Sequence, residues 1–407
     1  MVVRKYLCCL TCGKELLLRT AIGRGEYQEF AFPCGGCGIE IRYGMNLFPK
    51  ETRWEFSKLV NAKWIRPKTE PKDVLVIDPE TLIPLDIGNF FSPFLLTAHL
   101  PTNVLGYHAN RELRLFLCLE AWPVLRKCKV HFDNRNWRLY KKEFRALDPK
   151  FDENDENLCI AHFLRTLHRF SNAFRPFSDA KSRMLRQRIN YAEALKLELC
   201  DDLRAYLRSI GWSASLFHEL SSLKDRWSSI YLIVQPVYLS FYWDETTNSL
   251  DDFTLAQKRF DDLKPFFIDV YETLCRVSLI AAAIEGIIWC KDLRIQGAKH
   301  LLSLEDYRQL DNGIKATMVR NLVIGPVFSG MAENRLRNGI GHHSAHYDVK
   351  TDTIEYRNEG KGRITTDHIG YVRFCEKLAK LWYDFELVSV YIHWLVAREY
   401  GLKGKVV

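Results

Sequence analysis

Two cysteine turns near the N-terminus constrain this chain more than any other feature. Cys9-Leu-Thr-Cys12-Gly and Cys34-Gly-Gly-Cys37-Gly each place two thiols on one tight loop, and 21 residues lie between Cys12 and Cys34. Two such turns supply the four sulfurs of a tetrahedral zinc site, and the following glycines relieve the backbone where amide groups approach the sulfur. The spacing therefore predicts a structural zinc bound by these four cysteines. We expect a zinc ribbon over residues 1–48, with the intervening strands forming its hairpin.

The remaining cysteines are not expected to bind metal. Cys8 could replace Cys9 as a ligand, but only Cys9 gives the two-residue spacing, so we expect Cys8 to be a packing residue. Seven of the 12 cysteines are scattered singly through apolar segments beyond residue 37. Because four thiolates fill the coordination sphere of zinc, we expect the ion to stabilise a small module, and we expect no catalytic metal.

The sequence predicts a cytoplasmic protein that does not associate with membranes. The N-terminal residues lack the apolar run of a secretory signal, so the thiols are expected to stay reduced. The two most apolar stretches, residues 230–243 and 277–290, contain polar side chains and are shorter than the ~20 residues that span a bilayer. We therefore expect both stretches to be buried core segments.

The basic charge of the chain is concentrated near the cysteines. The net charge of +8 is compatible with nucleic acid binding and with many other roles. Residues 1–70 hold 12 Lys or Arg and 7 Asp or Glu, a net charge of +5. The same segment carries four aromatic residues that could stack on bases, namely Tyr6, Tyr27, Tyr43 and Trp54. The sequence leaves open whether the ribbon binds nucleic acid or a protein.

The length of 407 residues suggests two or three domains, and the fold is predicted to be mainly α. Residues 27–32, 39–43 and 73–78 have the pattern of short strands. Prolines interrupt the pattern between residues 67 and 101, and this part has no assigned role. The expected regions are a zinc ribbon at 1–48, a mixed α+β region at 49–150, a helical connector at 151–210 and a helical bundle at 211–407.

The second half of the chain is expected to be helical. Apolar residues at spacings of three and four predict one amphipathic helix from Ser178 to near Gly211. Its outward face is either a solvated surface or a basic strip that faces RNA, and it carries Lys181, Arg183, Arg186 and Arg188. Further helices are expected from Ser213, from Leu255 to Trp289 with a bend or break at Pro265, and from Thr366-Asp367 to Gly401.

Residues 333–348, Glu-Asn-Arg-Leu-Arg-Asn-Gly-Ile-Gly-His-His-Ser-Ala-His-Tyr-Asp, bring cations and imidazoles together. In a regular helix, five residues at 100° each would turn Arg337 and His342 about 140° apart. Gly339 and Gly341 are expected to end the helix. Arg337, Asn338 and His342 could then converge at a bend.

Such a trio suits phosphodiester cleavage by an adjacent ribose 2′-hydroxyl, a reaction that needs no metal. Histidine accepts and donates protons near neutral pH, and arginine binds phosphate oxygens as a permanently charged fork. Asparagine can orient either partner. We therefore take Arg337, Asn338 and His342 as the candidate catalytic residues.

The segment Arg337-Asn338-x-x-x-His342 in a helical bundle resembles the signature of the HEPN superfamily. In that signature four to six residues separate the arginine from the histidine, and asparagine usually follows the arginine. Residues 347–356 are expected to form a β-hairpin similar to the insert that often follows this motif before the final helix. The resemblance covers about residues 210–400 and is nearest to bacterial ribonucleases of defence and toxin systems.

The resemblance implies an RNA endonuclease active without metal, with tRNA among its candidate substrates. It also implies a homodimer formed through the bundle, with two motifs facing each other. Toxins of one HEPN branch carry tyrosine two residues after the motif histidine, where this chain has Ser344, which argues against a toxin–antitoxin pair of that kind. Glu285, in an apolar run, could pair with Arg337 and position it, as an acidic residue does in HEPN relatives, or it could face the surface.

Alternative interpretations of the motif remain open. His342, His343 and His346 could form a metal site, although the glycines weaken the intact helix that i, i+4 ligation needs. Arg337 could simply cap its helix. At the level of the whole protein, one hypothesis is an endoribonuclease acting as an antiviral or toxin effector, with the N-terminal half regulating it or presenting RNA. The other is a non-catalytic zinc-ribbon scaffold that binds RNA or dimerises. The regulatory partner is unknown.

Overall fold

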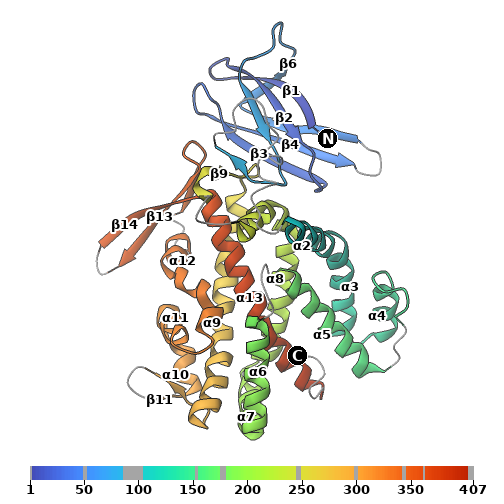
Figure 1. Cartoon of the computed structure of the whole chain (residues 1–407), viewed down its shortest axis with the longest axis vertical. Coiled ribbons are helices and arrows are strands. Elements are labelled where there is room, and N and C mark those ends of the chain that lie inside the picture. The colour runs from blue at the N-terminus through green and yellow to red at the C-terminus, as the bar shows by residue number, and fades with distance from the viewer. Residues whose placement is uncertain are drawn as a thin grey trace. The chain divides into compact units, whose positions relative to one another are not determined.

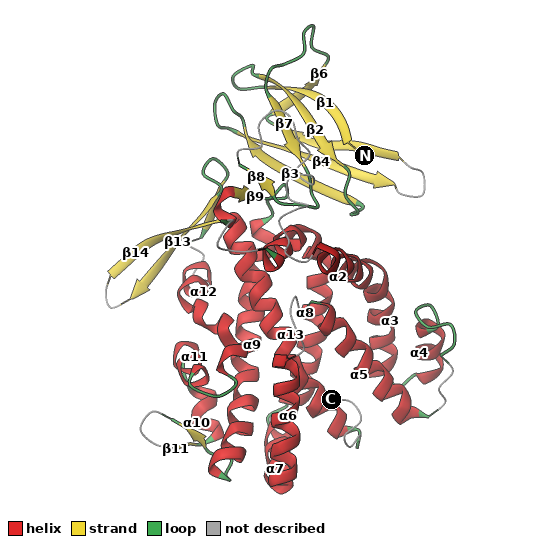
Figure 2. Ribbon diagram, in the orientation of Figure 1, coloured by secondary structure: helices red, strands yellow, loops and turns green. Residues whose placement is uncertain are grey.

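The computed structural model describes residues 2–48, 53–85, 104–151, 155–174, 180–243, 249–297, 301–341, 345–360 and 363–401. The chain forms two compact units, each built from three separate segments. Unit 1 comprises Met1–Ala109, Ile230–Lys264 and Asn338–Ala379, and unit 2 comprises Asn110–Ser229, Pro265–Arg337 and Lys380–Val407. Most strands belong to unit 1, whereas unit 2 is almost entirely helical, which agrees with a mainly α chain that has an N-terminal β region (Figure 2).

Two sheets form the N-terminal part of unit 1. The first has the strand order β6-β1-β2-β7 and the second β3-β4-β5, with all neighbours antiparallel except the parallel pair β2 and β7. The strands are β1 (Val2–Cys9), β2 (Glu15–Ala21), β3 (Tyr27–Pro33), β4 (Glu40–Phe48), β5 (Arg53–Val60), β6 (Ala62–Ile65) and β7 (Val74–Ile77). The strands predicted at 27–32, 39–43 and 73–78 are confirmed as β3, β4 and β7.

The hairpins differ from the expected ribbon in one respect. The strands between the two cysteine turns, β2 and β3, belong to different sheets and do not pair. Instead the first turn joins β1 to β2 and the second joins β3 to β4, so each turn is the tip of its own hairpin. The strands β5, β6 and β7, beyond residue 48, complete the two sheets.

Apolar side chains from both sheets form one core. Leu7 and Leu18 of the first sheet and Phe30, Ile41 and Tyr43 of the second are fully buried. The hydroxyl groups of Tyr43 and Thr20 lie 2.7 Å apart, so the buried phenol has a hydrogen-bond partner. Tyr43 therefore cannot stack on a base, contrary to the possibility raised from sequence.

Apart from β8 (Ile83–Pro84), the other strands and short helices of unit 1 come from the middle and end of the chain. They are η3 (Gln235–Tyr242), η4 (Leu250–Asp252), β9 (Phe253–Thr254), β12 (His346–Asp348), β13 (Thr353–Gly360) and β14 (Arg363–Gly370). The strand β8 pairs with β9, and the last three strands form an antiparallel sheet. The β-hairpin expected over residues 347–356 is thus present as β12 and β13.

The third strand of this sheet replaces the expected start of the final helix. Thr366 and Asp367 were expected to open that helix, but both lie in β14, which pairs with β13 along its whole length. The Asp367 carboxylate accepts a hydrogen bond from the Asn358 amide at 2.7 Å, across the strands. The final helix, α13 (Tyr371–Glu399), begins only after β14 ends.

Helices make up most of unit 2. The elements up to the middle of the chain are α2 (Val104–Phe116), η2 (Leu117–Ala121), α3 (Trp122–Asp133), α4 (Trp137–Phe144), α5 (Glu156–Ala173), α6 (Ala180–Leu195), α7 (Leu197–Ser209) and α8 (Trp212–Val234). They are followed by α9 (Phe260–Cys290), β10 (Ile295–Gln296), β11 (Leu301–Leu302), α10 (Leu304–Gln309), α11 (Asn312–Arg320), η5 (Gly325–Glu333) and α12 (Asn334–Gly341). Five of the helices, α2, α8, α9, α12 and α13, also extend into unit 1.

Two helix expectations need correction. The single helix expected from Ser178 to Gly211 is two helices, α6 and α7, separated at Lys196, whose φ of −152° is not helical. Conversely, α9 continues through Pro265, so of the two alternatives expected there, a bend or a break, the break is wrong. The helix expected from Ser213 is confirmed as α8.

The core of unit 2 lies where α8, α9 and α13 run alongside one another (Figure 1). The rings of Trp227 on α8 and Trp382 on α13 stack with centroids 4.8 Å apart, and Phe266 of α9 packs on both. Lys224 and Glu386 form an ion pair among these helices, and both side chains are completely buried. The lysine also donates to the Ser171 hydroxyl of α5 at 3.0 Å.

The apolar segments behave as core segments. Every described residue of 230–243 except Leu232 is buried, as is most of 277–290. Within the described part of the chain, α9 is the one helix long and apolar enough to span a membrane, and 83% of its most apolar window is buried inside the protein. Such burial is typical of a core helix.

Asp384 of α13 provides a pH-dependent contribution to stability. Burial raises the pKa of Asp384 to about 7, although the Gly330 amide and the Ser329 hydroxyl donate to its carboxylate. Because the folded state then binds the proton more tightly than the unfolded chain, this contribution falls as the pH rises from about 4 to 7. Loss of the Asp384 proton should make the free energy of unfolding of the wild type fall by about 2 kcal/mol between about pH 5.5 and 8. We predict that Asp384→Asn lacks this fall. Urea unfolding at both pH values measures it, with Asp133→Asn as the exposed control.

Candidate functional site

The four predicted cysteine ligands lie together. The Sγ atoms of Cys9, Cys12, Cys34 and Cys37 are all within 4.8 Å of one another. The pairs Cys9–Cys37 and Cys12–Cys34 are 3.8 and 3.6 Å apart. A tetrahedron with zinc–sulfur bonds of about 2.3 Å has sulfur–sulfur edges of about 3.8 Å. The sulfur positions and the all-thiolate donor set therefore fit a structural zinc ion.

The two turns are built alike. The N–H groups of Gly13 and Gly38 donate to the carbonyl oxygens of Cys9 and Cys34 at 3.0 and 2.8 Å. Both glycines have positive φ, +74° and +72°, a conformation that side chains with a Cβ rarely adopt. Cys8 is outside the cluster, with its thiol directed to the Gly13 carbonyl at 3.5 Å. The choice of Cys9 over Cys8 is thus confirmed by the geometry.

Backbone amides favour the thiolate form of one ligand. Burial opposes ionisation of Cys9, but the amides of Cys12 and Thr11 and the neighbouring thiols outweigh it and lower the pKa of Cys9 to about 7. Cys12 shifts the other way: the Lys14 amide favours its thiolate, but burial and the other three thiols raise its pKa to about 11. Of these two ligands, Cys9 therefore loses its proton before Cys12.

We predict that Cys9→Ser abolishes stoichiometric zinc binding, whereas Cys8→Ser retains it. Removing one thiolate leaves the ion three ligands, and the tips of two hairpins lose their link. The melting temperature of Cys9→Ser should fall by roughly 10 °C, while that of Cys8→Ser should stay within a few degrees. Zinc content by mass spectrometry and thermal unfolding check both variants. If Cys9→Ser retained zinc and Cys8→Ser lost it, Cys8 would be the ligand and the prediction would be wrong.

The Arg337 motif lies on a helix that does not end where expected. The helix α12 continues through Gly339 to Gly341. A Cβ atom at Gly339 would lie 2.3 Å from Cδ2 of Tyr356 on β13, so this glycine allows the close approach of helix and strand. His342 and His343 lie outside the described residues. Convergence of His342 with Arg337 therefore requires the chain to leave the helix directly after Gly341.

Arg337 forms an ion pair that sequence analysis did not find. Its Nη2 contacts Glu272 of α9, and the two side chains are 26% and 33% exposed. The other oxygen of Glu272 accepts a hydrogen bond from the Asn312 amide of α11 at 2.8 Å. The Tyr271 hydroxyl contacts the Asn334 side chain at the start of α12, at 3.2 Å. The carboxylate beside Arg337 is thus itself fixed from a second helix. The boundary between the units falls directly after Arg337, within α12.

Glu285 has neither of the roles considered for it. Arg188 of α6 donates to both of its oxygens, at 2.8 and 2.6 Å, and the Trp289 indole donates to one at 3.0 Å. The Glu285 side chain is only 2% exposed. This arrangement also changes the interpretation of α6, because Arg188 points to a buried carboxylate and cannot belong to an outward basic strip. Arg186 contacts the His168 ring at 3.1 Å.

The structure also bears on the other cysteines and on the alternative metal site formed by histidines. Among the described residues, the cysteine cluster is the one group of three or more metal-ligating side chains. The alternative metal site formed with His346 involves His342 and His343, which are outside those residues. The seven scattered cysteines are buried, except for the partly exposed Cys290, as expected of packing residues. Comparison with protein-family models, curated proteins and solved structures finds no match for the chain.

We predict that Gly339→Ala destabilises the protein and that Gly370→Ala does not. The alanine Cβ at 339 would overlap the Tyr356 ring, and accommodation of the overlap should cost about 1–3 kcal/mol. Nothing lies within 4 Å of a Cβ at Gly370, at the end of β14. Chemical denaturation of both variants measures the difference. An unchanged stability for Gly339→Ala would show that helix and strand are not in close contact.

Proposed function

We propose that this protein is a metal-independent RNA endonuclease with Arg337, Asn338 and His342 at its centre. The observation that carries the proposal is the ion pair between Glu272 and Arg337 at the edge of a helical bundle. It fixes the orientation of a permanently charged guanidinium that stays partly exposed, as phosphate recognition needs. The order of a motif helix, a β-hairpin and a long final helix also agrees with the HEPN resemblance.

The reaction would use the chemistry of these side chains. A base removes the proton of the ribose 2′-hydroxyl, whose oxygen attacks the adjacent phosphorus. The bond to the 5′-oxygen then breaks, and that oxygen takes up a proton, which leaves a 2′,3′-cyclic phosphate and a 5′-hydroxyl. His342 serves in proton transfer, Arg337 stabilises the charge on the phosphate oxygens, and Asn338 orients one of these two side chains. In a homodimer the second motif would supply the other histidine.

The other parts of the chain have supporting roles in this proposal. The zinc-bearing sheets of unit 1, with the basic charge of residues 1–70, would present RNA to the motif or regulate it. The zinc takes no part in the reaction because four thiolates occupy its coordination positions. An effector of antiviral defence or a toxin, acting in the cytoplasm, is the corresponding biological role.

The test is RNA cleavage by the zinc-loaded protein in the presence of a chelator. Total RNA and tRNA are incubated with enough EDTA to remove magnesium, and zinc content is measured afterwards to confirm that the cysteine site is intact. We predict cleavage by the wild type and a loss of at least about 100-fold in His342→Ala and Arg337→Ala. Glu272→Gln, which removes the charge that positions Arg337, should lose about tenfold. The control His346→Ala should change the rate by less than about twofold, because His346 is an exposed residue of β12.

Three results would contradict the proposal. Equal cleavage by all variants would indicate a contaminating nuclease. Cleavage that chelation abolishes and that His342→Ala retains would favour a metal site. RNA binding that weakens with salt, persists in His342→Ala and yields no products even with the wild type would identify the non-catalytic scaffold.

A further inference from the structure

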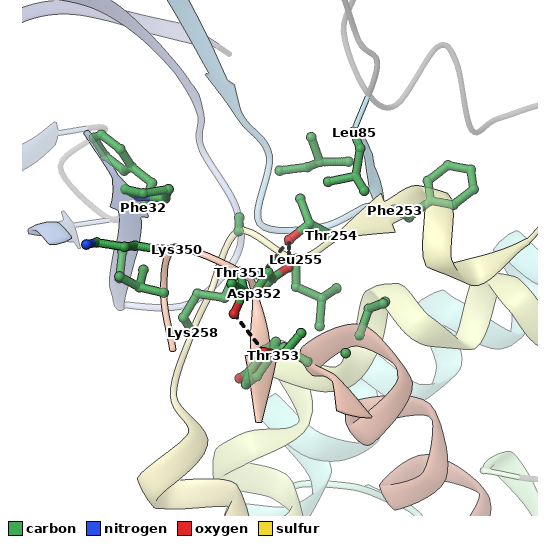
Figure 3. Close-up of a pocket in the computed structure, with 18 of the residues that line it drawn as sticks. Phe32, Leu85, Phe253, Thr254, Leu255, Lys258, Lys350, Thr351, Asp352 and Thr353 are labelled. Atoms are coloured by element: carbon green, nitrogen blue, oxygen red, sulfur yellow. Dashed lines mark hydrogen bonds and ion pairs between the residues drawn. The ribbon is translucent and has the colours of Figure 1, made fainter. Parts of the chain in front are cut away.

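Unit 1 contains a cavity of about 540 Å³, a size typical of small-molecule sites. Four parts of the unit line it: the end of β3, the segment from β7 to Leu85, residues 251–258, and the β12–β13 turn with the start of α13 (Figure 3). Most of its wall is apolar, with Phe32, Leu75, Ile83, Leu85, Phe253 and Val372 among the lining side chains. Neither the predicted zinc ligands nor the Arg337 motif lies in this wall.

Polar groups gather at one place in this apolar wall. Lys258 donates to the Asp352 carboxylate at 2.6 Å and to the Thr254 hydroxyl at 2.5 Å. The hydroxyls of Thr254 and Tyr347 also donate to Asp352, at 2.5 and 2.8 Å. Figure 3 shows Thr254, Lys258 and Asp352 close together below Leu85. We call these four side chains the polar floor of the cavity.

The floor is held rigidly. Asp352 has a positive φ of +53° in the β12–β13 turn, and its carbonyl accepts from the Tyr371 amide at 2.9 Å. The Lys258 side chain is only 6% exposed and lies over the Tyr371 ring, 4.9 Å from its centroid. The same turn is supported by the second cysteine turn, because a Cβ at Gly38 would lie 3.0 Å from Cε of Lys350. A rigid, preformed floor reduces the entropic cost of ligand binding.

The charges and hydrogen-bonding capacity of the floor define what it can bind. Lys258 and Asp352 carry opposite charges, so the floor is neutral overall and an ionised ligand would meet a like charge in a poorly solvated place. A carboxylate offers about four lone-pair sites, and Asp352 uses three. An ammonium has three N–H donors, and Lys258 uses two. One acceptor position of Asp352 and one donor position of Lys258 thus remain, on two groups that lie 2.6 Å apart. Burial lowers the pKa of Lys258, which agrees with its place away from solvent.

We propose that this cavity binds an uncharged, largely apolar ring molecule that carries a hydrogen-bond donor next to an acceptor, as a lactam does. The ligand N–H donates to Asp352, its carbonyl accepts from Lys258, and its rings contact the apolar wall. The site is separate from the proposed nuclease residues, and binding at it does not depend on whether the protein cleaves RNA.

The test uses three matched probes on the zinc-loaded full chain. Quinolin-2(1H)-one has the N–H and carbonyl edge, 1-methylquinolin-2-one lacks the donor, and quinoline-2-carboxylate is an anion. Saturation-transfer NMR titrations give the dissociation constants. We predict that quinolin-2(1H)-one binds about tenfold more tightly than either other probe, since each leaves a buried polar group of the floor unsatisfied. Equal binding of the first two probes, tighter binding of the carboxylate or no saturable binding would overturn the proposal.

A double variant locates the binding. Lys258→Met with Asp352→Asn removes both charges together, and asparagine tolerates the positive φ of residue 352. The tenfold preference for the N–H probe should disappear in this variant. It should persist in the matched control Lys129→Met with Asp133→Asn, which removes an ion pair of α3 in unit 2. A preference that persists in the first variant would place the probe elsewhere. The comparison of the probes on the wild type tests the proposal even where the double variant is unstable.

Discussion

The burial of α13 on all sides is the constraint on which unit 2 depends. A helix with one solvated face can carry polar residues there, but every residue of α13 from Asp384 to Ala397 is buried, so this part of the helix has no solvated face. Its polar side chains must therefore find partners inside the protein, since an unpaired buried charge would cost several kcal/mol. Glu386 obtains Lys224 from α8, and Asp384 obtains the Ser329 hydroxyl and the Gly330 amide from η5. These pairings specify which elements surround α13, and the Asp384 contacts anchor the segment that leads directly into the Arg337 helix.

A different constraint organises unit 1. The two cysteine turns are the tips of hairpins that belong to separate sheets, so a bound zinc would link the sheets covalently where their backbones do not pair. This explains why the sulfur cluster needs a β structure that extends to residue 77 and does not end at residue 48. The end of β3 leads into the second turn and also lines the cavity, and Gly38 of that turn contacts Lys350. The residues directly before Cys34 are therefore part of the cavity wall.

Local chemistry in the sequence predicted the elements whose causes are local. The cysteine spacing identified all four clustered thiols, and strand patterns placed β3, β4 and β7. Predictions failed where contacts with residues distant in the sequence determine the local structure. Thr366-Asp367 has the chemistry of a helix start, but pairing with β13 places it in a strand. The sequence predicts that Gly339 ends a helix. In the structure this position needs glycine because the Tyr356 ring leaves no space for a side chain, and only the tertiary fold brings that ring near. Glu285 attracted attention because an acidic residue in an apolar run must be paired, yet the sequence could not show that Arg188 was the partner.

The sequence does contain a pattern that points to Glu272 as the partner of Arg337. Asp269, Glu272 and Arg276 occupy one face of α9 at helical spacing, in a part of the helix less apolar than the run around Glu285. A carboxylate that positions a partly exposed arginine must itself be partly exposed, so the polar face of the helix was the better place to search than its apolar run. The helical end of α12 imposes a related requirement. Five residues of helix would hold Arg337 and His342 about 140° apart, so catalysis by both from one chain depends on a change of direction at residue 342.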